Sequence, residues 1–109
     1  KELMLNIFEK YKEILVSFTK WLRDKIDLNK DDASAACNDY LKVLGYTSLA
    51  FSWLKTIKIS YEKINTNKEF YEDKINTGRY YFEKILPRAQ SHYVIGTSGS
   101  KTTMVAKFN

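Results

Sequence analysis

The chain has 109 residues, enough for one domain but too few for two. It is 44% hydrophobic, with one proline and four glycines, a composition typical of a mostly helical globular protein. The net charge of +5 is spread along the chain, which predicts a solvated surface of mixed charge and argues against a nucleic-acid interface. No apolar run reaches the roughly 18 to 20 residues of a membrane span, so no membrane association is expected.

Two features of the chain bear on its setting. Cys37 is the only cysteine, which excludes an internal disulfide and favours a reducing, cytoplasmic setting. No CxxC motif or adjacent histidine activates its thiol, so we expect a small buried thiol on a helix. The sequence begins at Lys1 with neither a methionine nor a signal peptide. We therefore expect the C-terminal fragment of a longer chain.

Residues 2–26 form the first expected helix. Its apolar residues recur at steps of three and four, which places them on one helical face, while Lys and Glu fill the opposite face. This face consists of Met4, Phe8, Tyr11, Leu15, Phe18, Leu22 and Ile26. Such a helix needs a partner to cover its apolar stripe.

The second expected helix spans residues 32–65, after a break at 27–32 that is rich in Asn and Asp. Its middle is the most apolar long run of the sequence, and the apolar residues occupy more than one side. A helix of this kind is usually enclosed by others, so we place it at the centre of a bundle. Gly45 costs roughly 1 kcal/mol relative to alanine inside a helix, and we attribute it to a close helix crossing or to a slight bend.

The third expected helix spans residues 67–94. Thr66 and Glu69 have the spacing of a capping box at its start. Gly78 indicates a second close crossing. Pro87 predicts a kink or a boundary, because it lacks a backbone donor, and Leu86 is biased away from helical geometry.

The tail covers residues 96–109, where Met104, Val105 and Phe108 predict a short docked helical turn. Residues 96–102 superficially resemble a phosphate-binding loop, but Ser100 separates Gly99 from Lys101 and the segment follows a helix, so we do not expect nucleotide binding. The predicted fold is all-α: an up-down bundle of three long helices with a short C-terminal tail segment, in a single domain.

No residue pattern indicates catalysis or metal binding. His92 is the only histidine, and Ala89 stands where a Glu-x-x-His pair would need an acid, so we place His92 as a polar residue near a helix end. The chain has sixteen aromatic residues, from 2 Trp, 8 Tyr and 6 Phe. One small core cannot hold them all, and those in doubt are Tyr46, Phe51, Trp53, Tyr80 and Tyr81. Two explanations stay open: ordinary surface exposure, or burial against something absent from this chain.

Several motifs resemble one known family along nearly the whole chain. Residues 39–46 with 49–53 resemble the pattern YL-x-x-x-G followed by a tryptophan eight residues later, found in the extra C-terminal domain of acyl-CoA dehydrogenases of the acetyl-CoA dehydrogenase-like kind. Residues 70–74 and 80–87 are similar to the segment that closes that family, which ends in Leu-Pro. Met104 and Phe108 are similar to its last apolar pair. Gly78-Arg79 departs from the Ala-Arg that is common in the family, which would loosen the third helix.

The resemblance implies a parent enzyme of fatty acid metabolism that uses FAD to oxidise an acyl-CoA to the 2-enoyl-CoA and passes electrons to an electron-transfer flavoprotein. Enzymes called 3-(methylthio)propionyl-CoA dehydrogenases are similar. The catalytic and FAD-binding residues then belong to upstream domains, and this chain supplies no catalytic, cofactor-binding or metal residue of its own. The implied partners are the catalytic body and a second subunit.

The candidate packing or interface residues are Tyr40, Gly45, Tyr46, Trp53, Gly78, Tyr81, Met104 and Phe108. The alternative that remains open is a free-standing helical protein–protein interaction module.

Overall fold

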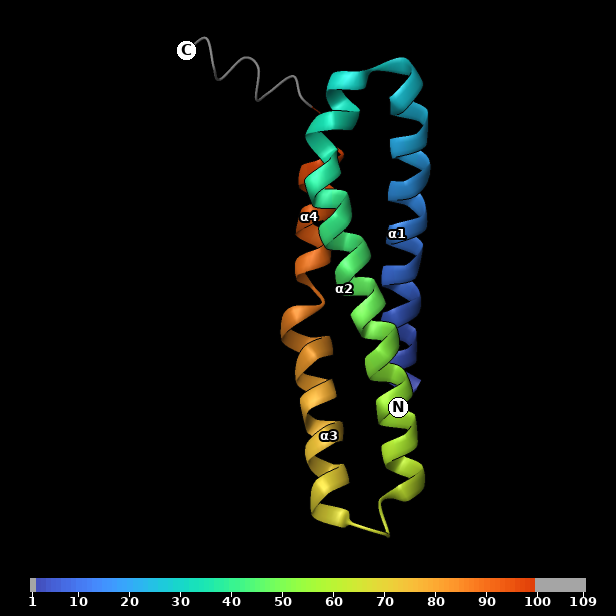
Figure 1. Cartoon of the computed structure of the whole chain (residues 1–109), viewed down its shortest axis with the longest axis vertical. Helices are drawn as coiled ribbons and strands as arrows, with labels where there is room; N and C mark the ends of the chain where they lie inside the picture. The colour runs from blue at the N-terminus through green and yellow to red at the C-terminus, as the bar shows by residue number, and fades with distance from the viewer. Residues whose placement is uncertain (1, 100–109) are drawn as a thin grey trace.

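The computed structural model describes residues 2–99, and every regular element among them is helical. These elements are α1 (Glu2–Leu28), α2 (Lys30–Lys63), α3 (Lys68–Tyr80), the π-helical turn η1 (Tyr81–Ile85) and α4 (Arg88–Gly96). Figure 1 shows three rods packed lengthwise: α1, α2, and a third rod in which α3, η1 and α4 follow one another. The predicted all-α bundle is confirmed. Within residues 2–99, no helix combines the length and the apolar character that crossing a membrane requires.

The α1–α2 interface has a seven-residue repeat on both helices. Met4, Tyr11 and Phe18 are buried on α1. The buried residues of α2 that repeat in the same way are smaller, namely Ala36, Val43, Ala50 and Ile57. A seven-residue spacing on both helices is typical of helices that pack lengthwise.

Ring contacts give the relative direction of these two helices. Phe8 lies 5.9 Å from Phe51, and Phe18 lies 5.3 Å from Tyr40, measured between ring centroids. Residue numbers fall along α2 as they rise along α1, so the two helices are antiparallel. A single residue outside both helices, Asn29, makes the reversal.

The break between α1 and α2 is narrower than the predicted 27–32. The side chain of Asn29 accepts a hydrogen bond from the amide of Asp32 at 3.2 Å, and this cap lets α2 begin at Lys30. Asp31 and Asp32 lie inside the first turn, where negative charge is favourable.

The predicted capping box at Thr66 is wrong by one residue. The side chain of Asn67 caps α3 by accepting from the amide of Phe70 at 3.2 Å. The Thr66 hydroxyl instead donates to the carbonyl of Lys63 at 2.6 Å and closes the end of α2. Asn is at least as good a cap as Thr, so the later residue defines the start of the helix.

The predicted boundary near Pro87 is present, and it divides the third helix. The Leu86 amide donates to the carbonyl of Tyr81, five residues earlier, at 2.8 Å, which makes the turn before the proline a π turn. Leu86 keeps right-handed helical angles, φ −55° and ψ −38°, so the expected bias away from helix at this residue is wrong. The wide turn makes room for the proline ring, and α4 then extends to Gly96, beyond the predicted end at 94.

Glycines within the helices have two kinds of surroundings. A Cβ added at Gly78 would lie 2.5 Å from Cδ1 of Ile57 on α2, and one added at Gly96 would lie 2.4 Å from Cζ of Phe18 on α1. Gly45 is exposed, and a Cβ there meets nothing within 4 Å. A close crossing is therefore present at Gly78, and it is the wrong explanation for Gly45 within residues 2–99.

This contrast predicts opposite effects of the same substitution. Gly78→Ala should lower the free energy of unfolding by about 1–3 kcal/mol, because the buried Ile57 has little room to move. Gly45→Ala should raise it by up to about 1 kcal/mol, because alanine is the better helix former and the space is open. Urea unfolding followed by circular dichroism at low protein concentration measures both. A Gly78→Ala protein as stable as Gly45→Ala would contradict the packing described here.

Candidate functional site

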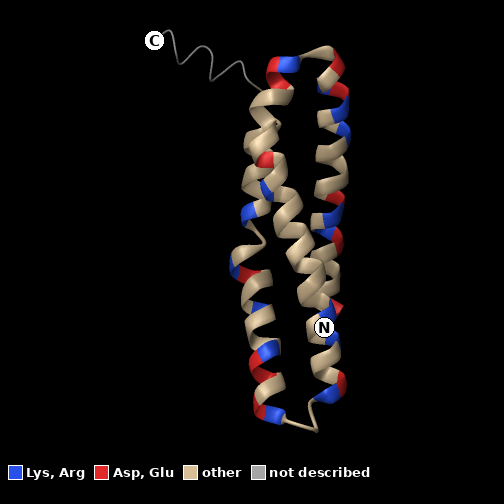
Figure 2. Ribbon diagram, in the orientation of Figure 1, with Lys and Arg blue, Asp and Glu red and all other residues tan. Residues whose placement is uncertain are grey.

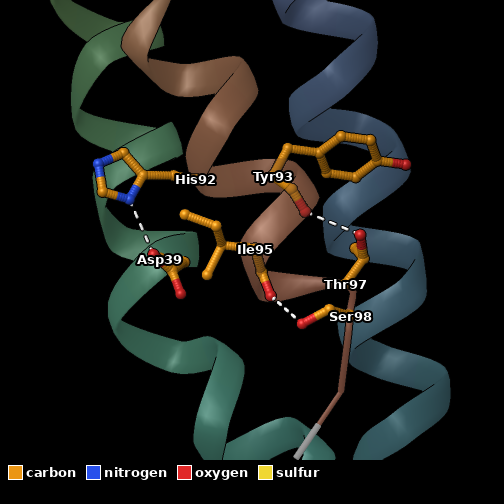
Figure 3. Close-up of polar contacts among 6 residues, drawn as sticks. All are labelled: Asp39, His92, Tyr93, Ile95, Thr97 and Ser98. Carbon is orange, nitrogen blue, oxygen red and sulfur yellow. Dashed lines mark hydrogen bonds and ion pairs between the residues drawn. The ribbon is translucent and has the colours of Figure 1, made fainter. Parts of the chain in front are cut away.

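A small polar cluster joins α2 to α4 in the half of the bundle nearer the α1–α2 turn. Nδ1 of His92 lies 2.8 Å from Oδ1 of Asp39, and the two side chains are only 28% and 18% exposed. Figure 3 shows them pointing toward one another from neighbouring helices. Since both are largely shielded from water, this contact fixes the position of α4 on α2.

Tyr46 extends the cluster along α2. Its ring stacks on the ring of His92 at 6.0 Å between centroids and 26° between planes. Its backbone carbonyl accepts a hydrogen bond from the hydroxyl of Tyr81, the first residue of the π turn. Burial, and to a lesser degree the neighbouring phenol of Tyr46, raises the pKa of Tyr81 to about 12. Tyr81 therefore remains a neutral donor at physiological pH and ties η1 to α2.

The end of α4 is closed by hydroxyl groups. The Thr97 hydroxyl donates to the carbonyl of Tyr93 at 2.8 Å, and the Ser98 hydroxyl donates to that of Ile95 at 2.7 Å (Figure 3). These bonds satisfy carbonyls that a helix end leaves without partners. The glycine-containing stretch that superficially resembles a phosphate loop thus begins as a helix C-terminus, whereas phosphate binding uses an N-terminus.

The cluster has the composition of a packing contact and lacks the groups of a catalytic or metal site. His92 and Asp39 supply one imidazole and one carboxylate, and residues 2–99 contain no group of three or more His, Cys, Asp or Glu placed to hold a metal ion. Cys37 is exposed, which corrects the expectation of a buried thiol, and its Sγ lies 3.2 Å from the carbonyl of Ala33.

The N-termini of α2 and α3 are unfavourable positions for the phosphate groups of a cofactor. A dinucleotide binds its pyrophosphate at a helix N-terminus with free amides. The two side-chain-capped N-termini of this bundle, those of α2 and α3, use an amide for the cap and carry Asp31, Asp32 and Glu69 in their first turns. Negative charge there repels a pyrophosphate.

The structure brings some of the predicted interface residues together and separates others. Tyr46 and Tyr81 meet in the polar cluster, and Cε3 of Trp53 would lie 3.1 Å from a Cβ added at Gly78. Tyr40 belongs to the α1–α2 contact, where its hydroxyl lies 2.7 Å from Oγ1 of Thr19. Three further residues complete the predicted set, of which Gly45 is exposed and Met104 and Phe108 lie outside the described residues.

Sequence reasoning missed the partner of His92 and the close contact at Gly96. Asp39 and His92 are 53 residues apart, and neither belongs to a recognisable motif. Gly96 was taken as the start of the tail, yet it lies at the end of α4 against Phe18. No local pattern reports such contacts, because they depend on the register between helices.

Apolar side chains remain uncovered on the outer side of α2. Leu41 and Leu49 are 62% and 54% exposed, and Ile59 is 46% exposed. Figure 2 shows a stretch of α2 without charged residues, which in the sequence covers residues 43–54. An uncharged, partly apolar stretch of this length on a small domain is typical of a contact surface.

The fold and the polar cluster define a helical-bundle domain. The profile of the family "Acetyl-CoA dehydrogenase C-terminal like" matches residues 2–107, nearly the entire chain. The chain belongs to this family. A comparison with curated proteins and one with solved structures each found no match.

The contact between Asp39 and His92 predicts an energetic coupling that a double-mutant cycle can measure. Asp39→Ala, His92→Ala and the double variant should give a coupling of about 0.5–1.5 kcal/mol in urea unfolding at neutral pH. The control is the exposed pair Glu9 and Lys12, whose charged atoms lie 3.6 Å apart and whose coupling should be smaller. Equal coupling in the two pairs would show that the Asp39–His92 contact does not position α4.

The raised pKa of Tyr81 predicts an alkaline loss of stability. Above pH 10 the unfolded chain loses this proton while the folded chain keeps it until about pH 12, so stability falls as pH rises through that window. Tyr81→Phe should lower stability at neutral pH by about 0.5–1.5 kcal/mol through loss of the hydrogen bond, and should flatten the decline between pH 10 and about pH 12.

Tyr80→Phe is the matched control for this prediction, because Tyr80 is the preceding residue and is 58% exposed. It should follow the unmodified chain at every pH. Denaturant unfolding at a series of alkaline pH values makes the comparison. An equal alkaline decline in both variants would exclude Tyr81 as the titrating group.

Proposed function

We propose that this chain is the non-catalytic C-terminal helical domain of an FAD-dependent acyl-CoA dehydrogenase-like enzyme, and that it supports subunit packing or dimerisation. Family membership over residues 2–107 supports the parent class. The uncovered apolar stretch of α2 is the observation that supports a packing role. Its partners are the catalytic body and a second subunit, in a cytoplasmic setting that suits the lone thiol of Cys37.

The proposed division of labour leaves the chemistry to the catalytic body. In the parent reaction a carboxylate removes the alpha proton of an acyl-CoA while the beta hydrogen leaves as hydride for the flavin. In this proposal the flavin site and the acid–base groups belong to the catalytic body, and the one imidazole of this chain lies against Asp39. In this proposal the up-down order of the three rods provides a stiff element beside the body.

The alternative is a free-standing helical interaction module, and one observation favours it. The bundle encloses its own core, in which Phe18, Phe82 and Leu86 are almost completely buried. A domain that buries such residues by itself does not require a second body in order to fold. The two functions differ in what precedes residue 1 in the gene.

The test compares the product of the whole gene with a version that lacks residues 1–109. We expect the whole product to contain flavin and to dehydrogenate an acyl-CoA, and the isolated 109-residue chain to show no flavin absorbance. Deletion should leave the flavin content of the remaining body unchanged, while lowering its melting temperature or its oligomeric mass.

Two results would contradict the proposal. A reading frame upstream that encodes no dehydrogenase body would favour the interaction module. Flavin retained by the isolated chain would show that this domain belongs to the catalytic machinery.

A further inference from the structure

The outer face of α2, defined here by six exposed residues, forms one stripe along the helix. The steps between its members are seven, four, three, four and seven residues, so all six point to the same side. They are Ser34, Leu41, Gly45, Ser48, Ser52 and Ile59. None is charged, and α1, α3 and α4 pack against the other sides of α2.

Gly45 indicates that something closely packed belongs on this stripe. The two other glycines inside helices, Gly78 and Gly96, stand where a Cβ would collide with a neighbouring helix. Gly45 lowers helix stability relative to alanine just as they do, but a Cβ added there would have no neighbour within 4 Å. A helix from outside the chain that crosses at Gly45 gives this glycine the same role as the other two.

The outer face is complementary to itself when it is reversed. Positions at equal distances from the point between Tyr46 and Thr47 pair as Gly45 with Ser48, Leu41 with Ser52, and Ser34 with Ile59. Each bulky residue therefore meets a small one, which is the arrangement that packs two helices closely. Only an antiparallel pair of identical helices has this matching.

The charges at the ends of α2 are mixed and permit this pairing without selecting it. Asp31 and Lys63 are both exposed and lie 15.5 and 16.5 residues from the midpoint, so they approach each other on an antiparallel pair. Lys30, which is also exposed, lies 16.5 residues from the midpoint and brings a like charge to the same end. Residues 43–54 carry no charge, so the centre of the pair has no like-charge repulsion.

We propose that two copies of this chain pair through the outer face of α2, antiparallel, with Gly45 of each copy against Ser48 of the other. The inference rests on the proposed role in subunit packing and names the surface and the partner. Residues 100–109 or the catalytic body are the competing occupants, and the experiment below separates them from a second copy.

Disulfide cross-linking in the 109-residue chain tests the register. In a Cys37→Ser background, Ser48→Cys places the two thiols about 4.5 Å apart along the helix axis, within reach of a disulfide. Ser52→Cys is the matched control, because it lies on the same exposed face but about 16 Å along the axis from its counterpart. We expect the disulfide-linked dimer to form about tenfold or more faster with Ser48→Cys.

Light scattering on the Cys37→Ser chain, which contains no cysteine, provides the second measurement. We expect a dimer. Gly45→Leu should raise the dissociation constant of this dimer about tenfold or more. It should not lower the melting temperature of the dilute monomer, because in a single chain the leucine side chain enters open space.

Three results would overturn the inference: a monomer at all accessible concentrations, a dimer that cross-links equally well at both positions, or dimerisation only after removal of residues 100–109. The last would assign the face to the tail. None of these involves flavin, so they leave the test of the parent enzyme untouched, and failure of that test leaves the cross-linking result standing.

Discussion

The structure depends on the packing of aromatic side chains of α1 against α2 and α4. Phe18 is completely buried at this seam, where it contacts Tyr40 on α2 and Tyr93 and Gly96 on α4. One ring therefore holds all three rods at the same level. Because close packing leaves little free volume, the register of α1 on α2 also determines where α4 lies. The polar contacts between α2 and α4 depend on this register.

The central position of α2 explains why its apolar residues are not confined to one face of the helix. α2 contacts α1 on one side and α3, η1 and α4 on another, and the helix of 34 residues must bury apolar groups toward both. When a helix is apolar on two sides, the polar residues left over are too few to identify the side that faces solvent. The predicted central position of this helix follows from that pattern. The pattern does not say whether the third side faces water or protein.

Much of the fold could be predicted from the sequence, because local physics controls it. The repeats of Met4, Tyr11 and Phe18 on one helix and the punctuation by Asn29, Asn67 and Pro87 locate the rods. Errors arose where two residues compete for one role. Thr66 and Asn67 are both good caps, and only the amide that is actually free decides between them. Leu86 remained helical because the π turn relieves the clash that the dipeptide rule assumes.

The candidate site was less predictable, because its contacts lie between helices. Asp39 faces His92 only when α2 and α4 are in the observed register. A shift of α4 by one helical turn along α2 would separate the two side chains. Gly78 and Gly45 look alike in the sequence, yet one adjoins Ile57 and the other adjoins nothing within residues 2–99. A glycine inside a helix therefore does not reveal by sequence alone whether a neighbouring helix lies against it.

On α2 large apolar side chains are exposed while small side chains are buried, the opposite of what a small domain usually shows. Leu41 and Leu49 remain in water while buried positions on the same helix hold Ala36, Ala50 and Ser60. Exchanging large and small residues would cover more apolar surface within one chain, but the buried positions have little free volume for larger side chains. The exposed leucines therefore stay in water in the isolated bundle. The pairing proposed above for the outer face of α2 would remove Leu41 from water, a stabilisation that the single bundle cannot supply.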